Sequence, residues 1–441
     1  MARRRKVDVI TLGCSKNLVD SERLLKMLHD VGMQVRHDPS PEDEDSSPAD
    51  IVIINTCGFI GDAKEESVNT ILRYARKRTE GTLSRLYVMG CLSQRYQKEL
   101  PAEIPEVDKW YGKTDWSGIV RDLTREFPAT ASYDRLITTP RHHAYLKISE
   151  GCNRFCAFCA IPLITGRHHS RPAGEIIDEV KMLVDRGVKE FNVIAQDLSS
   201  YGTDIKGNGG LASLVASISE VPGVEWIRLH YAYPAQFPMD VLSVMAERQN
   251  VCKYIDIALQ HASDKMLSAM RRNITRDRTE RLLSDIRSTV PDIHIRTTMM
   301  TGFPGETDKD FKELMEFVGQ QKFERLGAFA YSEEEDTFAA KNYSDSVPEH
   351  LKRERLDLLM ALQEEISMNH QTEKVGRILK VMVDREEEDY FIGRTQWDSP
   401  EVDPEVLIRK SAGLTPGHFA EVKITEALPF ELIGEKSDRN D

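Results

Sequence analysis

The sequence lacks an excess of positive charge, a long apolar run and a cysteine pattern typical of disulfide bonding. Its 441 residues contain 59 Lys and Arg against 72 Asp and Glu, which gives a formal net charge of −13. Nucleic-acid-binding surfaces are usually basic, so this balance argues against direct nucleic-acid binding by the chain as a whole. It leaves room for local basic faces.

The sequence also has no segment typical of a membrane-spanning helix or a signal peptide. No apolar run approaches the roughly 20 residues that a membrane-spanning helix needs. The basic start MARRRK is followed by a short apolar run that contains Asp8, which does not fit the longer apolar core of a signal peptide. We therefore expect a soluble cytoplasmic protein without membrane contacts.

The seven cysteines are an odd number in a long chain, so we do not expect a disulfide framework. Three of them, Cys152, Cys156 and Cys159, lie close together in EGCNRFCAFCAIP at residues 150–162. The spacing C-x3-C-x2-C favours a 4Fe–4S cluster in which one iron has no protein ligand.

A structural zinc site is the alternative for this loop. It needs a fourth ligand, which His168 or His169 could supply. Structural zinc sites are usually built from two separated pairs of ligands, however, and only one such group is visible in the sequence.

Residues 1–130 alternate apolar strands with helical patterns, which predicts a parallel α/β domain. Three of its predicted strands end at Cys14, Cys57 and Cys91. Because parallel strands finish at one edge of a sheet, where ligands bind, these cysteines are expected to converge on a shared site. The alternative is that each is a small buried side chain.

Residues 138–374 repeat the strand–helix pattern six times and end in a long helix, which predicts a partial TIM barrel. The six predicted strands cover residues 144–151, 190–196, 225–233, 253–260, 294–302 and 325–332. The three-cysteine loop leaves the first strand, so it is expected at the carboxyl edge, where such barrels carry out chemistry. Cys252 precedes a strand and is interpreted as structural.

Residues 375–441 contain short strands separated by Gly and Pro, which predicts a small all-β barrel. Residues 376–441 hold nine Lys and Arg against fifteen Asp and Glu, so this module is acidic. The length of the chain agrees with about three domains.

The motif CNRFCAFC after the first strand of a six-unit barrel resembles the radical S-adenosylmethionine superfamily. The resemblance implies that the methionyl amine and carboxylate of S-adenosylmethionine occupy the open iron. It also implies that the cluster, once reduced by an electron donor, cleaves S-adenosylmethionine to methionine and a 5′-deoxyadenosyl radical.

The whole chain resembles the methylthiotransferases of this superfamily, in which the terminal β-barrel is a TRAM domain. The resemblance implies a second 4Fe–4S cluster on Cys14, Cys57 and Cys91, whose open iron carries the sulfur species. Ser15 departs from the Pro usually found after the first cysteine, and YSEEEDTFAA lacks the usual Pro and Gly.

The segments TLGCSKNLVDSERL and DIALQHASDKML resemble the branch that modifies the β-carbon of an aspartate in small-subunit ribosomal protein twelve. The acidic terminal module fits this basic substrate, because complementary charge speeds encounter, although it is also compatible with a solvated face. The alternatives are the branch that modifies isopentenyladenosine in tRNA, and a non-enzymatic ribosome-associated iron–sulfur factor.

Five further residues are candidates for binding S-adenosylmethionine: Phe158, Gln196, Gln260, Arg296 and Thr298. The resemblance implies that Phe158 helps to place the adenine, and a guanidinium such as that of Arg296 can hold a carboxylate in bidentate fashion. Packing or barrel structure is the alternative for each. Arg271 and Arg272 are interpreted as the solvated end of a helix.

Overall fold

The computed structural model describes residues 5–124, 133–207 and 209–437. The chain divides into two compact units, each of which is described by itself. Unit 1 comprises Met1–Thr138, Glu150–Asn153 and Cys159–His168, and unit 2 holds the remaining residues. The predicted domain boundary at residue 130 lies outside the described residues. Over the described part of the chain, no helix is long and apolar enough to cross a membrane.

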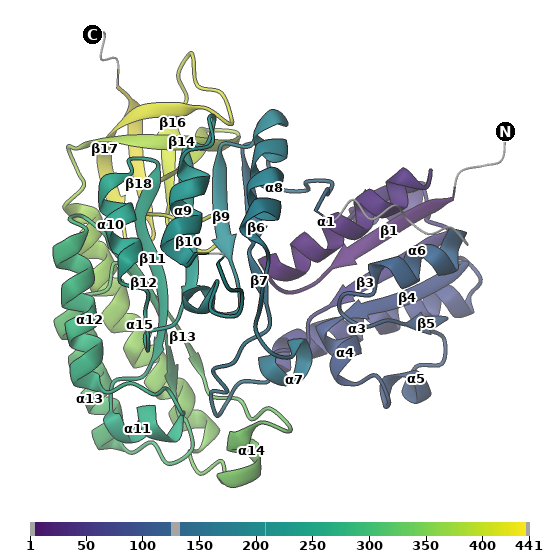
Figure 1. Cartoon of the computed structure of the whole chain (residues 1–441), viewed down its shortest axis with the longest axis horizontal. Coiled ribbons are helices and arrows are strands. Elements are labelled where there is room, and N and C mark those ends of the chain that lie inside the picture. The colour runs from purple at the N-terminus through teal and green to yellow at the C-terminus, as the bar shows by residue number, and fades with distance from the viewer. Residues whose placement is uncertain (1–4, 125–132, 208, 438–441) are drawn as a thin grey trace. The chain divides into compact units, whose positions relative to one another are not determined.

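Unit 1 contains a five-stranded parallel sheet in the order β2-β1-β3-β4-β5 (Figure 1). The strands are β1 (Lys6–Thr11), β2 (Gln34–His37), β3 (Ile51–Thr56), β4 (Arg85–Gly90) and β5 (Lys109–Trp110). The helices are α1 (Ser15–Asp30), α2 (Pro41–Ser46), α3 (Gly61–Thr79), α4 (Cys91–Arg95), α5 (Leu100–Glu103), α6 (Trp116–Thr124) and α7 (Ile161–Thr165).

The sheet is buried on both faces, which explains why its strands read as continuous apolar runs. In β3, Ile51 and Ile53 join a core with residues of α1 and α6. Val52 and Ile54 point the other way, into a core with residues of α3. The alternation of side chains along a strand produces these two cores.

Unit 2 begins with a six-stranded parallel sheet in the order β13-β12-β11-β10-β9-β6, the partial barrel that the sequence predicts. Its strands are β6 (His143–Lys147), β9 (Glu190–Ile194), β10 (Trp226–Ala232), β11 (Val251–Gln260), β12 (His294–Thr301) and β13 (Arg325–Ala330), and a short ribbon pairs β7 (Ser149–Glu150) with β8 (His169–Ser170). The helices are α8 (Ala173–Asp185), the 3-10 helix η1 (Leu198–Ser200), α9 (Leu211–Ser219), α10 (Asp240–Glu247), α11 (Asp264–Ala269), α12 (Arg276–Thr289), α13 (Asp308–Gln321), α14 (Phe338–Asn342) and α15 (Glu349–Thr372).

The end of the chain forms a closed barrel in the order β14-β15-β16-β18-β17, as predicted. Its strands are β14 (Ile378–Glu386), β15 (Tyr390–Thr395), β16 (Glu405–Arg409), β17 (Phe419–Leu428) and β18 (Glu431–Lys436). A core that includes Val381, Ile392 and Val422 fills its interior.

This terminal barrel contacts the amino edge of the six-stranded sheet. Arg394 of β15 binds Glu190, the first residue of β9, through bonds of 3.0 and 2.8 Å. Arg325, the first residue of β13, binds Asp398. The carboxyl edge, where the cysteine loop begins, therefore lies at the opposite end of the strands.

Three local elements complete this description. The acidic segment 37–50 contains α2, whose first turn is capped because the Ser40 hydroxyl accepts the Asp43 backbone N–H at 3.2 Å. Two short helices, α4 and α5, follow β4. Strand β18 closes the terminal barrel beside β16.

Candidate functional site

The three N-terminal cysteines lie at the carboxyl ends of neighbouring strands, as the sequence predicts. Cys14 follows β1 and precedes α1, Cys57 follows β3 directly, and Cys91 follows β4 as the first residue of α4. Because β1, β3 and β4 are adjacent in the sheet, the three residues share one edge of unit 1. Cys14 is exposed, whereas Cys57 and Cys91 are buried.

The backbone around these cysteines is closely packed. A Cβ atom at Gly13 would lie 2.7 Å from Cys57 Cβ and 2.9 Å from its Sγ, and the φ angle of Gly13 is +93°. Only glycine fits this conformation and this approach without strain. Asn17 fixes the same edge, since its Nδ2 donates to the carbonyls of Leu12 and Thr56 at 2.9 and 3.1 Å.

Two opposing effects act on the thiols of this edge: burial, which disfavours the thiolate form, and one nearby cation, which favours it. Burial raises the pKa of Cys57, and burial raises the pKa of Cys91 to about 12 although the Lys113 ammonium opposes this rise. Burial alone would lower the pKa of Lys113, but Asp20 and Glu150 outweigh it, so the ammonium stays charged. Lys113 Nζ lies 2.5 Å from Glu150 Oε1. Lys113 thus supplies a fixed positive charge near Cys91, which the sequence analysis missed.

The cysteine loop contributes to both units, with Cys152 and Cys159 in unit 1 and Cys156 in unit 2. Cys152 and Cys156 are buried and Cys159 is partly exposed. Gly151 has a φ angle of +78°, and a Cβ atom there would lie 2.1 Å from the Arg167 carbonyl oxygen. Glycine at this position therefore lets the chain turn tightly just before Cys152, the first cysteine of the loop.

In unit 2, Cys156 has two polar neighbours that the sequence analysis did not identify. Arg272 Nη1 donates to Cys156 Sγ at 3.1 Å, and the Tyr233 hydroxyl lies 3.9 Å from the same sulfur. The guanidinium of Arg272 also stacks over the Tyr233 ring at 4.2 Å, with that of Arg154 at 4.3 Å.

The interpretation of Arg272 as a solvated residue was wrong. Its side chain is only 3% exposed, whereas the neighbouring Arg271 is exposed and lies over the Phe338 ring. Arg272 follows a turn in which Arg271 adopts a φ angle of +57°, so the chain reverses and turns Arg272 inward. Composition alone carries no signal for such a reversal.

Four of the predicted cofactor-binding residues lie in or after the carboxyl half of their strands, or in the cysteine loop. Gln260 ends β11 with a φ angle of +75°, and its buried Oε1 has no hydrogen-bond partner among the described residues. Gln196 follows β9, and Thr298 lies in the second half of β12. The Phe158 ring meets Phe303 edge-on at 6.5 Å. Their contacts with S-adenosylmethionine stay predictions.

Arg296 has different surroundings from the other four. It is the third residue of β12, near the amino edge, and its guanidinium lies 3.2 Å from Asp403 and 3.7 Å from Asp256. Two carboxylates thus already pair with the guanidinium that was predicted to bind the methionyl carboxylate. This geometry favours a structural role for Arg296, and its contact with the cofactor stays a prediction.

The cysteine geometry also bears on the kind of metal site. No three or more His, Cys, Asp or Glu side chains in residues 5–124, 133–207 and 209–437 are arranged to hold a single metal ion. A 4Fe–4S cluster does not need such an arrangement, because each cysteine binds a different iron. A cluster on the three cysteines of this sheet edge stays a prediction.

Within unit 1, the segment after Cys159 packs against Cys91. Cys91 forms a small buried core with Ala160 and Ile164. Ala160 directly follows Cys159, and Ile164 belongs to α7, which packs against α4. The end of the cysteine loop is therefore held against one of the three strand-end cysteines.

Family models match three parts of the chain. Residues 146–318 match the radical SAM superfamily, and residues 375–436 match the TRAM domain. Residues 6–112 match a family described as the uncharacterized protein family UPF0004.

Curated relatives match along nearly the whole chain. The ribosomal protein uS12 methylthiotransferase RimO of Bacteroides fragilis is 57% identical over 434 residues, which cover 98% of this chain and 99% of that protein. The proteins of the same name from Porphyromonas gingivalis and Cytophaga hutchinsonii are 56% and 48% identical, each over 98% of this chain and over 98% and 97% of their own lengths.

Solved structures share the fold at low sequence identity. The radical S-adenosylmethionine methyltransferase TsrM from Kitasatospora setae superposes with a TM-score of 0.56 at 15% identity, covering 77% of both chains. The cobalamin-dependent S-adenosylmethionine radical enzyme OxsB gives 0.51 at 13% identity, over 82% of this chain and 56% of its own. These similarities show the fold alone.

Proposed function

The chain belongs to the RimO family of ribosomal protein uS12 methylthiotransferases, and we propose that it inserts a methylthio group at the β-carbon of one aspartate of uS12. The observation that carries this proposal is the 57% identity to a curated family member over 98% of the chain. The three matched modules appear in the order that the sequence predicts: an N-terminal α/β domain, a radical SAM barrel and a TRAM barrel.

As a member of the radical SAM superfamily, the chain uses a 4Fe–4S cluster and S-adenosylmethionine. When bound and reduced by an external donor, such a cluster would supply the electron for the cleavage of S-adenosylmethionine. We assign the cluster to Cys152, Cys156 and Cys159. The spacing of these residues and the carboxyl-edge origin of their loop support the assignment.

We further propose a second 4Fe–4S cluster on Cys14, Cys57 and Cys91. Their position on three adjacent strand ends supports this site. The packing of Cys91 against Ala160 supports a functional link, because it holds the sulfur-carrying site beside the cysteine loop within unit 1. A reaction that joins sulfur transfer to radical formation needs the two sites close together.

The protein's own residues bind, orient and exclude water. Lys113 balances negative charge near Cys91, and Arg272 holds the Cys156 sulfur in place. We propose that Gln196, Gln260 and Thr298 contact S-adenosylmethionine at the carboxyl edge. An apolar cluster around the loop keeps water out, which limits side reactions of a reactive intermediate; it includes Ala157, Met266, Met270, Met300, Phe303 and Tyr331.

Replacing Arg272 by Gln is expected to make the radical SAM cluster harder to reduce. A hydrogen bond to a cluster sulfur stabilises the electron-rich reduced state, so its loss lowers the reduction potential. At a fixed solution potential, we expect the ratio of reduced to oxidised cluster to fall about tenfold. For a one-electron couple this corresponds to a reduction potential lower by about 59 mV. Electron paramagnetic resonance during a redox titration measures this ratio.

Arg271→Gln is the matched control, because Arg271 is exposed and contacts Phe338 rather than the cysteine. Its potential should equal that of the unaltered protein. An unchanged potential in Arg272→Gln with full iron content would show that Arg272 only supports the loop.

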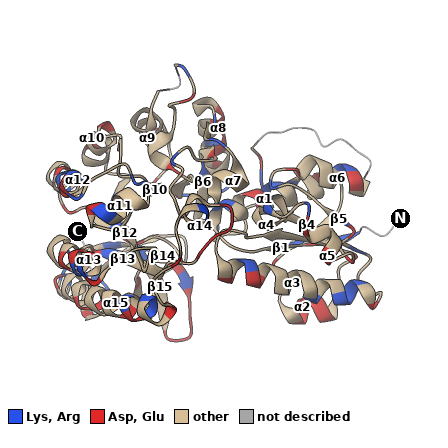
Figure 2. Cartoon of the chain, turned by 90° about the horizontal axis from the view of Figure 1, so that it is seen from below, with Lys and Arg blue, Asp and Glu red and all other residues tan. Residues whose placement is uncertain are grey.

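Charge near the carboxyl edge also fits a basic ribosomal protein. Three exposed acids, Glu333, Glu335 and Asp336, follow β13 at the carboxyl edge, while the run at residues 386–389 spans the end of β14 and the turn to β15. Over the helices α13 and α15, acidic and basic residues are mixed rather than separated (Figure 2). The acids after β13, at the edge where chemistry is expected, are therefore better placed than the TRAM acids to meet the substrate.

Deleting the gene is expected to remove a methylthio group from a single aspartate of uS12. Mass spectrometry of the uS12 peptides from cells with and without the gene measures this change directly. Reintroducing the gene should restore the modified peptide, which serves as the control. If the uS12 peptide is unchanged while tRNA loses its methylthio-adenosine, the assignment of the substrate is wrong.

A further inference from the structure

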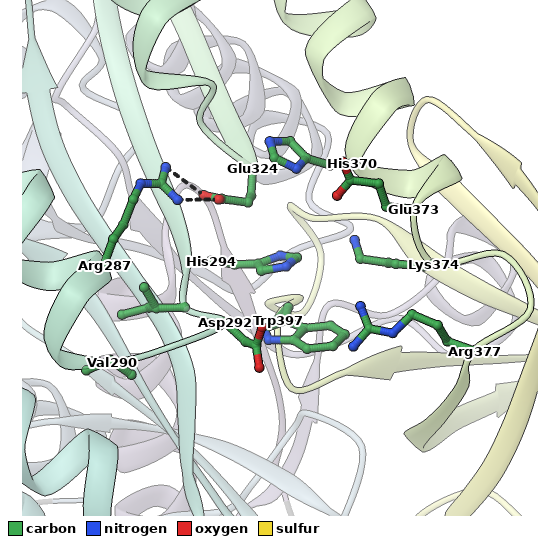
Figure 3. Close-up of a pocket in the computed structure, with 11 residues that line it drawn as sticks. Arg287, Val290, Asp292, His294, Glu324, His370, Glu373, Lys374, Arg377 and Trp397 are labelled. Atoms are coloured by element: carbon green, nitrogen blue, oxygen red, sulfur yellow. Dashed lines mark hydrogen bonds and ion pairs between the residues drawn. The ribbon is translucent and has the colours of Figure 1, made fainter.

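A cavity of about 250 Å³ lies at the amino edge of the six-stranded sheet, the edge opposite to the one where the cysteine loop begins. Figure 3 shows the residues that line it. Its walls come from the end of α12 and the loop after it, from the end of α15, and from the TRAM barrel. The lining residues that carry charge or polar atoms are Arg287, Asp292, His294, Glu324, His370, Glu373, Lys374, Arg377 and Trp397. At roughly 30 Å³ per water, it has room for about eight waters.

The innermost polar groups of this cavity are donors. Lys374 is 3% exposed, and its Nζ donates to Gln371 Oε1 at 2.5 Å. The described residues accept no hydrogen bond from the other two protons of this ammonium. Trp397 is 6% exposed, and its Nε1 is buried without a hydrogen-bond partner among the described residues, as is His294 Nδ1. An indole N–H and an ammonium can only donate, so a ligand here must accept.

The charged groups around His294 bear on the charge that a ligand of this cavity would carry. Burial lowers the pKa of His294 well below its usual value, and the cations Lys374, Arg325, His370 and Arg287 lower it further. These cations would also attract an anion bound beside His294. The lining holds three carboxylates as well, Asp292, Glu324 and Glu373.

The charge of Lys374 is poorly compensated. Burial lowers the pKa of Lys374 to about 7, and Arg325 and Arg377 add to this effect while Asp398 and Glu324 oppose it. Both acids are already engaged, because Asp398 binds Arg325 and Glu324 binds Arg287.

The two other carboxylates of the cavity, Asp292 and Glu373, are exposed. Water screens their charge, so they do little to neutralise the buried ammonium. A buried cation without its own counter-ion is costly, and an anionic ligand would remove that cost.

The donors are held on a fixed platform. The His294 ring stacks on Trp397 at 4.7 Å with an angle of 12° between the planes. Arg377 and Lys374 lie 5.6 and 5.7 Å from the centroid of the same ring, as cation–π partners. Figure 3 shows Lys374 and Arg377 on the same side of the cavity, opposite His294.

We propose that this cavity binds the phosphate group of a phosphate ester or of free phosphate, with Lys374, Arg377 and the Trp397 indole N–H as its donors. A tetrahedral oxyanion offers acceptors in several directions, which matches donors that approach from several sides. The site lies apart from the cysteines and does not depend on the proposed activity.

A second cavity, of about 310 Å³, shares Asp292, Arg377 and Trp397 with the first and adds Lys253 and Lys380 to its walls. Cations in two adjoining cavities suit either one phosphate group or successive phosphates along an RNA backbone. In both cases cationic donors bind a phosphate oxyanion. An experiment distinguishes the two sources of that phosphate. The global acidity of the chain does not exclude this local site.

Calorimetry with inorganic phosphate on the anaerobically purified, cluster-loaded protein tests the proposal. We expect saturable binding that is at least tenfold weaker in Lys374→Met and in Arg377→Gln. Arg377 is exposed, so the second variant is expected to fold normally even if the first does not. Lys423→Gln, an exposed lysine of the TRAM barrel that lines neither cavity, should bind as the unaltered protein does.

Proton uptake gives a second readout. Above pH 7 the free Lys374 is mostly neutral, and a bound anion raises its pKa, so binding at pH 8 should take up a proton. Titrations in two buffers of different ionisation enthalpy measure this uptake, which should vanish in Lys374→Met. Absence of phosphate binding, or equal binding by all variants, would overturn the proposal.

A competition experiment with RNA identifies the source of the phosphate. A short single-stranded RNA that competes with phosphate, and whose binding weakens in Arg377→Gln and also in Lys253→Gln, identifies backbone phosphates as the ligand. Phosphate binding that such an RNA does not displace identifies a free phosphate or small ester instead. Both outcomes support the oxyanion site.

Discussion

Replacing Cys14, Cys57 and Cys91 together by alanine is expected to halve the iron content, from about eight to about four irons per chain. Cleavage of S-adenosylmethionine to 5′-deoxyadenosine should continue, because the loop cysteines stay intact. Methylthio transfer to uS12 should fall to background. The reason is structural: these residues sit at the ends of β1, β3 and β4 and are the proposed site of the sulfur species.

The complementary triple variant of Cys152, Cys156 and Cys159 should also keep about four irons, but it should lose both 5′-deoxyadenosine formation and product. Iron and acid-labile sulfide counts, together with chromatography of the reaction products, distinguish the two variants. Cys252→Ala is the control, since Cys252 is buried in β11 outside both sets. A protein that carries zinc without acid-labile sulfide would contradict the two-cluster proposal.

The architecture was predictable because both sheets leave strong local signals. Strands of a parallel sheet covered on both faces are continuous apolar runs, and all six barrel strands fall within or next to the predicted segments. The shared edge of Cys14, Cys57 and Cys91 followed from their places after such runs. That prediction rested on the rule that parallel strands end at one edge of a sheet. It needed no knowledge of tertiary contacts.

The missed features depend on tertiary contacts that leave little trace in the local sequence. Arg272 looks like half of a solvated basic pair, and only a chain reversal brings it to Cys156. Lys113 lies between predicted elements, and its burial depends on Asp20 and Glu150, which are distant in sequence. The docking of the TRAM barrel on the amino edge likewise brings Asp403 to Arg296, a residue predicted to face the cofactor.

That docking rests on buried charge, which the final prediction tests. Glu190, with no exposed surface, receives two hydrogen bonds from Arg394 and one from Arg228. Arg394 also binds Asp384 at 2.7 and 2.8 Å, and His142 binds the same carboxylate at 2.8 Å. Burial alone would raise the pKa of Glu190, but the two guanidinium groups lower it to about 2.

Glu190→Gln is therefore expected to destabilise unit 2 by about 3–5 kcal/mol, because it leaves two buried guanidinium groups with one fewer carboxylate. For a unit of this size, this corresponds to a fall of roughly 10 °C in the apparent Tm. Differential scanning calorimetry measures the shift, and limited proteolysis should cut between the barrel and the TRAM strands earlier than in the unaltered protein.

Glu405→Gln, in the terminal barrel, provides the matched comparison within the same unit. Glu405 pairs with Arg385 at 2.6 and 2.9 Å, but both side chains are substantially exposed, so the loss should stay below about 1 kcal/mol. If the two variants shift the apparent Tm equally, the buried network adds nothing beyond surface pairing. The apolar contact between Trp226 and Phe419 would then be what holds the TRAM barrel to the sheet.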